Sequence, residues 1–289
     1  MCTLSGLLQQ RVHLDMQISA NFDSGNINVV STDSPQDIQL NIEKDHQSDF
    51  FQWFHFKIHN NEHVENVIKI LNASESAYVE GWENYQAVAS YDREHWFRVP
   101  TSFDGKQLTI EFTPEFDTTY YAYFAPYSYE RHQDLIHSAQ LDIDCQLQVL
   151  GQTLDGRDIS LLKVGEEGEG KKTIWLTARQ HPGETMAEWF MEGFIERLLD
   201  EDDGAARALL DKAVIYLVPN MNPDGSVRGH LRTNAVGANL NREWLEPTME
   251  RSPEVYLVRE KMFETGVDLH LDIHGDEALP YNFVAGGEG

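Results

Sequence analysis

The segment ARQHPGETMAEW (178–189) places a histidine and a glutamate three positions apart, at His181 and Glu184. An imidazole nitrogen and a carboxylate oxygen are both ligands that zinc accepts. The same residues also suit the start of a helix, because Pro182 fits a first helical position and Glu184 complements the helix dipole. Taken alone, this motif favours a helix start over a metal site.

A second segment, DLHLDIHGDE (268–277), alternates like a strand and directs His270, Asp272 and His274 to one side. Ligands of open α/β sheets gather beyond the carboxyl ends of strands, which favours His274 over His270. Two histidines and one carboxylate, with a fourth position open to water, form a catalytic zinc set. Taken alone, His274 is better explained as a structural histidine at a strand end.

The third candidate segment, residues 220–244, is rich in glycine and asparagine and carries Arg228, Arg232 and Arg242. Long irregular loops are usually either functional or disordered, and its Trp, Leu and Asn content argues against disorder. Arginine binds a carboxylate through two parallel hydrogen bonds and can stabilise a developing oxyanion. The segment predicts a local anion site, with ordinary surface arginines as the alternative.

The elements around these segments follow an alternating pattern of strands and helices from about residue 140 onward, which predicts an α/β domain. A strand pair is expected across the Asp155-Gly156 turn. The further strands are expected at 173–178, 213–218 and 267–274, and the helices at 126–140, 184–200 and 253–265. In the last helix, Ser252 is the expected N-cap and Pro253 the first residue.

The first 125 residues have a different pattern, with short β-branched and aromatic runs separated by turn sequences such as DSG, TDSP and DGK. Strands at this interval without helical stretches predict an antiparallel sandwich. We therefore expect an N-terminal β-sandwich domain at 1–128 and an α/β domain at 129–289.

The composition limits the possible partners. The 289 residues include 48 acidic and 22 basic ones, for a formal net charge of −26, which disfavours nucleic acids and anionic membranes. Two cysteines provide no disulfide framework, and no apolar run approaches the roughly 20 residues of a membrane span. The N-terminus lacks the pattern of a secretory signal. We expect a cytoplasmic protein that binds neither nucleic acid nor membrane.

Together, the motifs ARQHPGET, VPNMNPDG, GHLRTNAVGANLNREW and DIHGDE resemble those of the M14 zinc carboxypeptidases. The resemblance is to the cytosolic carboxypeptidase-like branch, which includes tubulin deglutamylases and bacterial relatives. It implies a carboxypeptidase-like mixed-sheet α/β catalytic domain preceded by a small antiparallel β-sandwich. It also implies a zinc-dependent metallocarboxypeptidase that hydrolyses the C-terminal peptide bond of peptides or protein tails through a zinc-activated water.

The resemblance assigns the candidate site residues. It implies that His181, Glu184 and His274 bind one zinc ion per chain. It implies that Arg232 polarises the scissile carbonyl and stabilises the oxyanion, and that Asn241 and Arg242 bind the terminal carboxylate of the substrate. Such binding would make the enzyme an exopeptidase.

Two departures from the family pattern concern the chemistry. Asn239 occupies a position where many members carry an aspartate that orients the first zinc histidine, so we expect a less basic ligand and somewhat weaker metal binding. The general-base glutamate is expected beyond Gly289, because Glu277 and Glu288 lie too close to the third ligand to match it. We therefore expect a catalytic domain that is incomplete at its C-terminus and lacks its side-chain specificity pocket.

Two other functions remain open on the sequence. A related zinc deacylase of small N-acyl amino acids would use the same ligand set. A non-catalytic module that binds C-termini would keep the carboxylate-binding residues without turnover, if the general base is absent. The sandwich and the long loop favour the peptidase, and nothing in the sequence indicates the oligomeric state.

Overall fold

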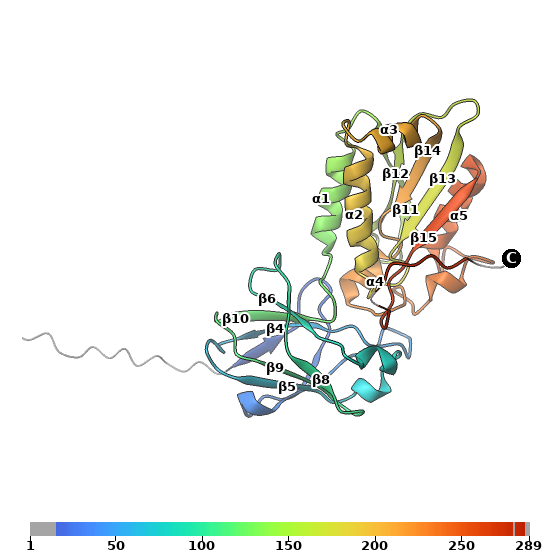
Figure 1. The fold of residues 1–289 in the computed structure, drawn as a ribbon. Coiled ribbons are helices and arrows are strands. Elements are labelled where there is room, and N and C mark those ends of the chain that lie inside the picture. Colours follow the sequence, from blue (N-terminus) through green and yellow to red (C-terminus); the bar gives the residue numbers. More distant parts are fainter. Residues whose placement is uncertain (1–15, 280, 287–289) are drawn as a thin grey trace, which may run out of the picture.

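The computed structural model describes residues 16–279 and 281–286 as two packed parts (Figure 1). Residues 17–122 form two facing sheets, and the elements from α1 (Tyr129–Ala139) to residue 273 form a sheet with helices on both faces. This is the mixed α/β architecture with a preceding β-sandwich that the sequence predicts. The exact division between residues 128 and 129 stays a prediction, although Ser128 caps α1 through its side chain.

The sandwich contains two five-stranded sheets. The first has the order β1 (Gln17–Ser19), β4 (His55–His59), β10 (Thr118–Ala122), β6 (Val88–Ser90) and β7 (Phe97–Arg98). The second has the order β2 (Asn28–Ser31), β3 (Ile38–Asn41), β5 (Asn66–Ile70), β9 (Leu108–Phe112) and β8 (Thr101–Phe103). Short 3-10 turns lie at η1 (Pro35–Asp37), η2 (Ala73–Glu75) and η3 (Val79–Trp82).

Alternation along the strands builds the core between these sheets. In β5, Ile68 and Ile70 are fully buried, while Val67 and Lys69, which alternate with them, are only partly buried. Aromatic residues from the other sheet, including Phe54 and Phe56, fill the same core. One detail departs from a purely antiparallel sandwich, because β3 and β5 pair in parallel.

The α/β domain has one mixed sheet. Its order is β11 (Cys145–Gln152), β12 (Asp158–Val164), β14 (Ala213–Val218), β13 (Lys172–Ala178) and β15 (Leu269–Ile273). The predicted hairpin across Gly156 is present, with that glycine at φ +80°. The three strands β14, β13 and β15 run parallel, and β12 pairs antiparallel with β14.

Helices cover both faces of this sheet (Figure 1). On one face, α1, α2 (Met186–Leu198) and α3 (Gly204–Leu210) pack on residues such as Leu176 and Ile215. On the other face, α5 (Pro253–Thr265) packs on Trp175 and Tyr216. Because helices cover both faces of β13 and β14, most side chains of these strands are buried, which explains their near-continuous apolar sequences.

The segment 220–244, expected to be irregular, contains one short helix and one 3-10 turn, α4 (Pro223–Arg228) and η4 (Leu240–Arg242). The Asn222 side chain accepts a hydrogen bond from Gly225 N, and Gly229 ends α4 at φ +70°. The expectation missed α4 because it is short and its residues have turn-like types. Ser252 does occupy the N-cap position of α5, but its side chain makes no capping hydrogen bond.

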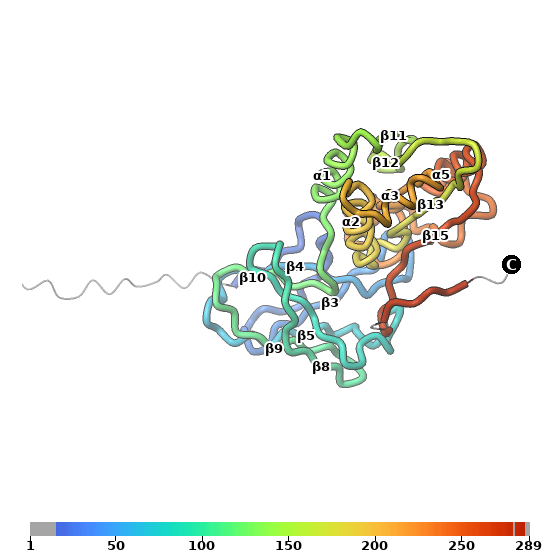
Figure 2. Tube along the Cα trace, turned by 45° about the horizontal axis from the view of Figure 1, so that its top comes forward, coloured from blue at the N-terminus to red at the C-terminus, as the bar shows by residue number. Residues whose placement is uncertain are grey.

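The sandwich and the α/β domain meet along this same segment. Ser24 N donates to Val227 O, and the Asn26 amide donates to Gly229 O. A Cβ at Gly229 would lie 2.6 Å from the carbonyl oxygen of Gly25, so only glycine permits this approach. Beyond β15 the chain runs back toward the sandwich, where Glu277 lies against Gly81 (Figure 2).

None of the helices in the described residues is both long and apolar enough to cross a bilayer.

Substituting Ile215→Ala tests the central role of β14. Ile215 is fully buried in the core that the sheet forms with α1, α2 and α3, so we expect the free energy of unfolding to fall by about 2–5 kcal/mol, from lost burial and a new cavity. Urea titration followed by circular dichroism measures the loss. Leu141→Ala is the control, because Leu141 is 84% exposed and should change stability by less than about 0.5 kcal/mol. Equal losses in both variants would contradict the assigned core.

Candidate metal and substrate site

The parallel pairing of β13 with β15 brings two distant segments to the same edge of the sheet. Ala178 at the end of β13 lies opposite Ile273 at the end of β15. The turn that follows β13 carries His181 and Glu184, and the residue that follows β15 is His274. Because the carboxyl ends of parallel strands face one way, the three side chains lie at one edge of the sheet.

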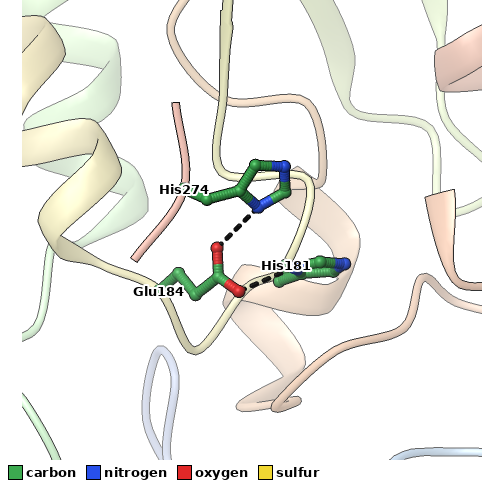
Figure 3. A group of neighbouring side chains, drawn as sticks. All are labelled: His181, Glu184 and His274. Carbon is green, nitrogen blue, oxygen red and sulfur yellow. Dashed lines mark hydrogen bonds and ion pairs between the residues drawn. The ribbon is translucent and has the colours of Figure 1, made fainter. Parts of the chain in front are cut away.

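Glu184 lies between the two histidines (Figure 3). Its Oε1 is 2.7 Å from His181 Nδ1, and its Oε2 is 2.8 Å from His274 Nδ1. One potential ligand atom from each residue lies within 4.8 Å of the others. His181 and Glu184 are almost completely buried, while His274 is partly exposed, so the cluster opens to solvent on one side.

The charges in this cluster stabilise one another. Burial alone would raise the pKa of Glu184, but hydrogen bonds from His181 and His274 outweigh it and lower that pKa to about 2. Burial would lower the pKa of His274, but its bonds to Asp272 and Glu184 raise it to about 10. Without a bound cation, positive histidine charge compensates the buried carboxylate.

Each imidazole has a second partner on its far nitrogen. His181 Nε2 lies 3.1 Å from Asn239 Oδ1, and His274 Nε2 lies 2.7 Å from Asp272 Oδ2. Asn239 therefore contacts the first histidine as its sequence position predicts, through a neutral amide oxygen. The second histidine is oriented by a carboxylate instead.

The Asp272 carboxylate is fixed by its own neighbours. It accepts hydrogen bonds from Thr177 Oγ1 and from the side-chain amide of Gln180. The Gln180 amide oxygen in turn accepts the indole N–H of Trp244 at 2.9 Å. His270 lies deeper in β15 and contacts Thr177 rather than the cluster, as expected.

The donor set fits a zinc ion. Each histidine can keep its proton on Nε2, where an oxygen accepts it, and offer the Nδ1 lone pair beside the Glu184 carboxylate. Two imidazole nitrogens and one carboxylate, open to solvent on one side, are the ligands of a catalytic zinc site.

Arg232 lies where the sandwich meets this site. Its guanidinium carbon lies 5.5 Å from the ring centre of Phe50 and 5.6 Å from that of Tyr78, both sandwich residues. Burial raises the pKa of the Tyr78 hydroxyl, and the charges that act on it belong to Arg232, Glu277, Glu184 and Arg242. The chain beside each arginine contacts the candidate metal cluster, because Leu231 O accepts Gly183 N and the Asn241 amide lies 3.5 Å from His274 Nε2.

The other predicted anion-binding residues separate into two groups. Asn241 is near the cluster, with its amide nitrogen 3.5 Å from His274 Nε2, and the adjacent Arg242 side chain is exposed to solvent. Arg228 lies elsewhere and makes two 2.8 Å hydrogen bonds to Asp155. The hypothesis of a site with three arginines therefore fails for Arg228, which stabilises the β11–β12 turn against α4.

Several residues that support the site had no role assigned from the sequence. Asp272 had a visible signal, because it shares the side of the strand that carries His274. Tyr78 and Asp45 come from the sandwich and carry no local motif; only the packing identifies them, Tyr78 beside the Arg232 guanidinium and Asp45 through its hydrogen bond from Arg232 N.

Comparison with known proteins agrees with this geometry. A family model described as the cytosolic carboxypeptidase N-terminal domain matches residues 18–124. A second model, zinc carboxypeptidase, matches residues 136–265. An uncharacterised protein of Zymomonas mobilis is 55% identical over 96% of this chain and 72% of its own length. Cytosolic carboxypeptidase 6 of Mus musculus is 31% identical over 94% of this chain and 55% of its own length.

Solved structures show the same likeness. A metallo-carboxypeptidase from Burkholderia cenocepacia is 53% identical, with a TM-score of 0.91 over 92% of this chain and 72% of that one. The Pseudomonas aeruginosa metallo-carboxypeptidase, solved in complex with (2-guanidinoethylmercapto)succinic acid, is 51% identical, with a TM-score of 0.87. That match covers 92% of this chain and 71% of the Pseudomonas chain.

The chain belongs to the M14 zinc carboxypeptidases, in the branch of the cytosolic carboxypeptidases. It spans about half the length of the mouse relative and somewhat less than three quarters of the bacterial structures. The family and the structural neighbours support zinc-dependent carboxypeptidase activity and favour neither the deacylase nor the non-catalytic module.

The substitution Asp272→Asn tests whether the Asp272 carboxylate strengthens His274 as a metal ligand. The substitution keeps the shape but removes the charge that makes the imidazole a stronger ligand, so we expect zinc affinity to fall about 10- to 100-fold. Competition with a chromophoric chelator measures it. Asp268→Asn is the matched control, because Asp268 pairs with Lys172 at the other end of the strand. An unchanged zinc affinity in Asp272→Asn would contradict the role of Asp272 in strengthening His274.

Asn239→Asp tests the opposite change at His181. A carboxylate in place of the amide oxygen would make that imidazole more basic, and we expect zinc to bind more tightly, by up to about tenfold. Gln146→Glu adds the same negative charge at an exposed position in β11 and controls for general attraction of the cation. Weaker binding in Asn239→Asp, or equal gains in both variants, would contradict the prediction.

Proposed function

We propose that this protein is a zinc-dependent metallocarboxypeptidase that hydrolyses the C-terminal peptide bond of peptides or protein tails. The observation that carries the proposal is the convergence of His181, Glu184 and His274 at the edge of the sheet, next to the segment that carries Arg232 and Arg242. A metal cluster beside a pair of arginines suits a substrate that has both a carbonyl to polarise and a carboxylate to bind.

The proposed metal ligands are His181, Glu184 and His274, holding one zinc ion per chain. When bound, zinc lowers the pKa of a coordinated water to about 7 and acts as a Lewis acid toward a carbonyl. Glu184 precedes α2, whose first residue is Met186, so it can bind the ion close to the positive end of that helix.

The remaining roles follow from position and charge. Arg242 is exposed, with Nη1 donating to Asn241 O at 3.0 Å, and can form a forked pair with the terminal carboxylate of a substrate, together with the amide of Asn241. Arg232 is held near the metal cluster and stabilises the negative charge that develops on the carbonyl oxygen. A substrate that must satisfy Arg242 with a free carboxylate is cleaved at its C-terminal bond. The proposal assigns no general base among the described residues.

The proposed substrates are peptides or protein tails with a free C-terminus, and the proposed compartment is the cytoplasm. The formal net charge of −26 opposes the approach of acidic tails at long range. Arg232 and Arg242 offset this locally, around the terminal carboxylate. Removal of acidic residues from tails, as in the deglutamylase branch, therefore depends on that local positive charge.

Release of free amino acids tests the function, with peptides of varied C-terminus and N-acetyl amino acids offered in parallel to the zinc-loaded protein. We expect release from peptides with a free C-terminal carboxylate, loss of activity after chelation, and recovery with zinc. Arg242→Ala should lower kcat/KM for these peptides about tenfold or more, because a charge-assisted hydrogen bond is lost.

Arg251→Ala is the control for Arg242→Ala, since Arg251 is an exposed arginine paired with Glu243. C-terminally amidated peptides should be poor substrates for the unmodified protein, and Arg242→Ala should reduce that discrimination. Preferential cleavage of N-acetyl amino acids would favour the deacylase. If Arg242→Ala still discriminated fully between free and amidated C-termini, the assigned role of Arg242 would be contradicted.

A further inference from the structure

We propose that Asp45, a buried residue of the β-sandwich, is a positioning residue for Arg232. The N-terminal domain would then set the place of the oxyanion-binding arginine and form part of the active site. This inference rests on the role of Arg232 in the proposed function.

The Asp45 carboxylate receives three consecutive backbone N–H groups. Its Oδ1 accepts Leu231 N at 2.7 Å, and its Oδ2 accepts Arg232 N and Thr233 N at 2.9 Å each. The Thr233 hydroxyl donates to the same Oδ2 at 3.0 Å. Asp45 is only 2% exposed, and hydrogen bonds to a charged acceptor in such surroundings are among the stronger ones.

Asp45 is itself held by the sandwich. Its N–H donates to Phe50 O at 2.9 Å, and its carbonyl accepts Ser48 N, so residues 45–50 form a closed loop. The next residue, His46, donates its N–H to His230 Nε2 at 3.1 Å. The carboxylate is therefore a fixed reference point for the segment 230–233.

Leu231, the residue before Arg232, is fixed as well. The Leu231 side chain belongs to the hydrophobic core of the sandwich, although the residue lies in the α/β half of the chain. The Leu231 carbonyl accepts the N–H of Gly183, which lies between His181 and Glu184. One short segment thus connects Asp45, the arginine and the turn that carries two candidate metal ligands.

The sandwich also contacts the side chain of Arg232. Phe50 and Tyr78 place aromatic rings beside the guanidinium, at 5.5 and 5.6 Å from the ring centres. Such cation–π contacts restrict a flexible side chain without consuming its hydrogen-bond donors. The donors of Arg232 remain available for an oxyanion while Asp45 fixes the backbone and the rings restrain the guanidinium.

Position matters at this residue because an oxyanion gains most from a donor held in place before the reaction. A misplacement of about 1 Å at a reacting centre can cost about 100-fold in rate. Replacing Asp45 with asparagine removes the charge and directs an amide N–H₂ group at a backbone N–H. The two donors repel each other, so at least one of the three backbone hydrogen bonds from residues 231–233 is lost. We expect Arg232 to lose its fixed place.

The test uses a phosphonate peptide, whose tetrahedral P–O⁻ group stands in for the oxyanion, bound to the zinc-loaded protein and measured by calorimetry. Asp45→Asn, Arg232→Ala and the double variant form a cycle, which separates action through Arg232 from independent effects. Asp49→Asn is the matched control, because Asp49 is an almost fully exposed acid in the same loop. Zinc content and thermal unfolding are recorded for every variant.

We expect Asp45→Asn to weaken phosphonate binding about tenfold or more with zinc content retained, and Asp49→Asn to leave it unchanged. In the Arg232→Ala background, Asp45→Asn should cost little further. Equal losses in both backgrounds, or no loss from Asp45→Asn, would overturn the positioning role of Asp45 and leave the proposed function of Arg232 intact. No loss from Arg232→Ala would instead refute the assigned role of Arg232.

A second set of variants covers the case in which Asp45→Asn fails to fold. Tyr78→Phe keeps the ring beside the guanidinium, and Tyr78→Leu removes it. We expect near-normal phosphonate affinity in Tyr78→Phe and weaker affinity in Tyr78→Leu. Equal affinity in these two variants would contradict positioning of Arg232 by the sandwich.

Discussion

The parallel pairing of β13 with β15 is the constraint on which the site depends. It places the ends of two strands, far apart in sequence, at one edge of the sheet, so that His181, Glu184 and His274 meet. The buried carboxylate of Glu184 then requires positive charge nearby, from histidine protons or from a metal ion. Helices cover β13 on both faces, whereas Leu269 and Leu271 of the edge strand β15 are exposed, so the pairing depends chiefly on the buried strand β13.

The sandwich contributes to the same site from outside the sheet. Segment 220–244 follows β14 and packs against the sandwich. Close contacts at Gly229 and the hydrogen bonds that Asp45 accepts fix its path. The Leu231 side chain lies in the sandwich core while its carbonyl contacts the turn of the metal ligands. The two parts therefore depend on each other for geometry.

The sequence predicted what periodicity and local chemistry encode. Strands β13 and β14 and helix α5 lie where their apolar patterns placed them, and the residues proposed as metal ligands converge. Short elements such as α4 were not predicted because a helix of six residues is too short to show a helical periodicity. Asp45 and Tyr78 escaped because their relation to Arg232 spans most of the chain, and Arg228 was misjudged because its partner, Asp155, lies on a distant turn.

X-ray diffraction from crystals of the zinc-loaded protein, with anomalous data at the zinc edge, tests the account most directly. The account predicts one strong peak per chain, bonded to Nδ1 of His181, Nδ1 of His274 and the carboxylate of Glu184, at about 2.0–2.2 Å. The Nε2 atoms should keep their contacts with Asn239 and Asp272. A peak at other residues, or bonds through the Nε2 atoms, would contradict the proposed centre.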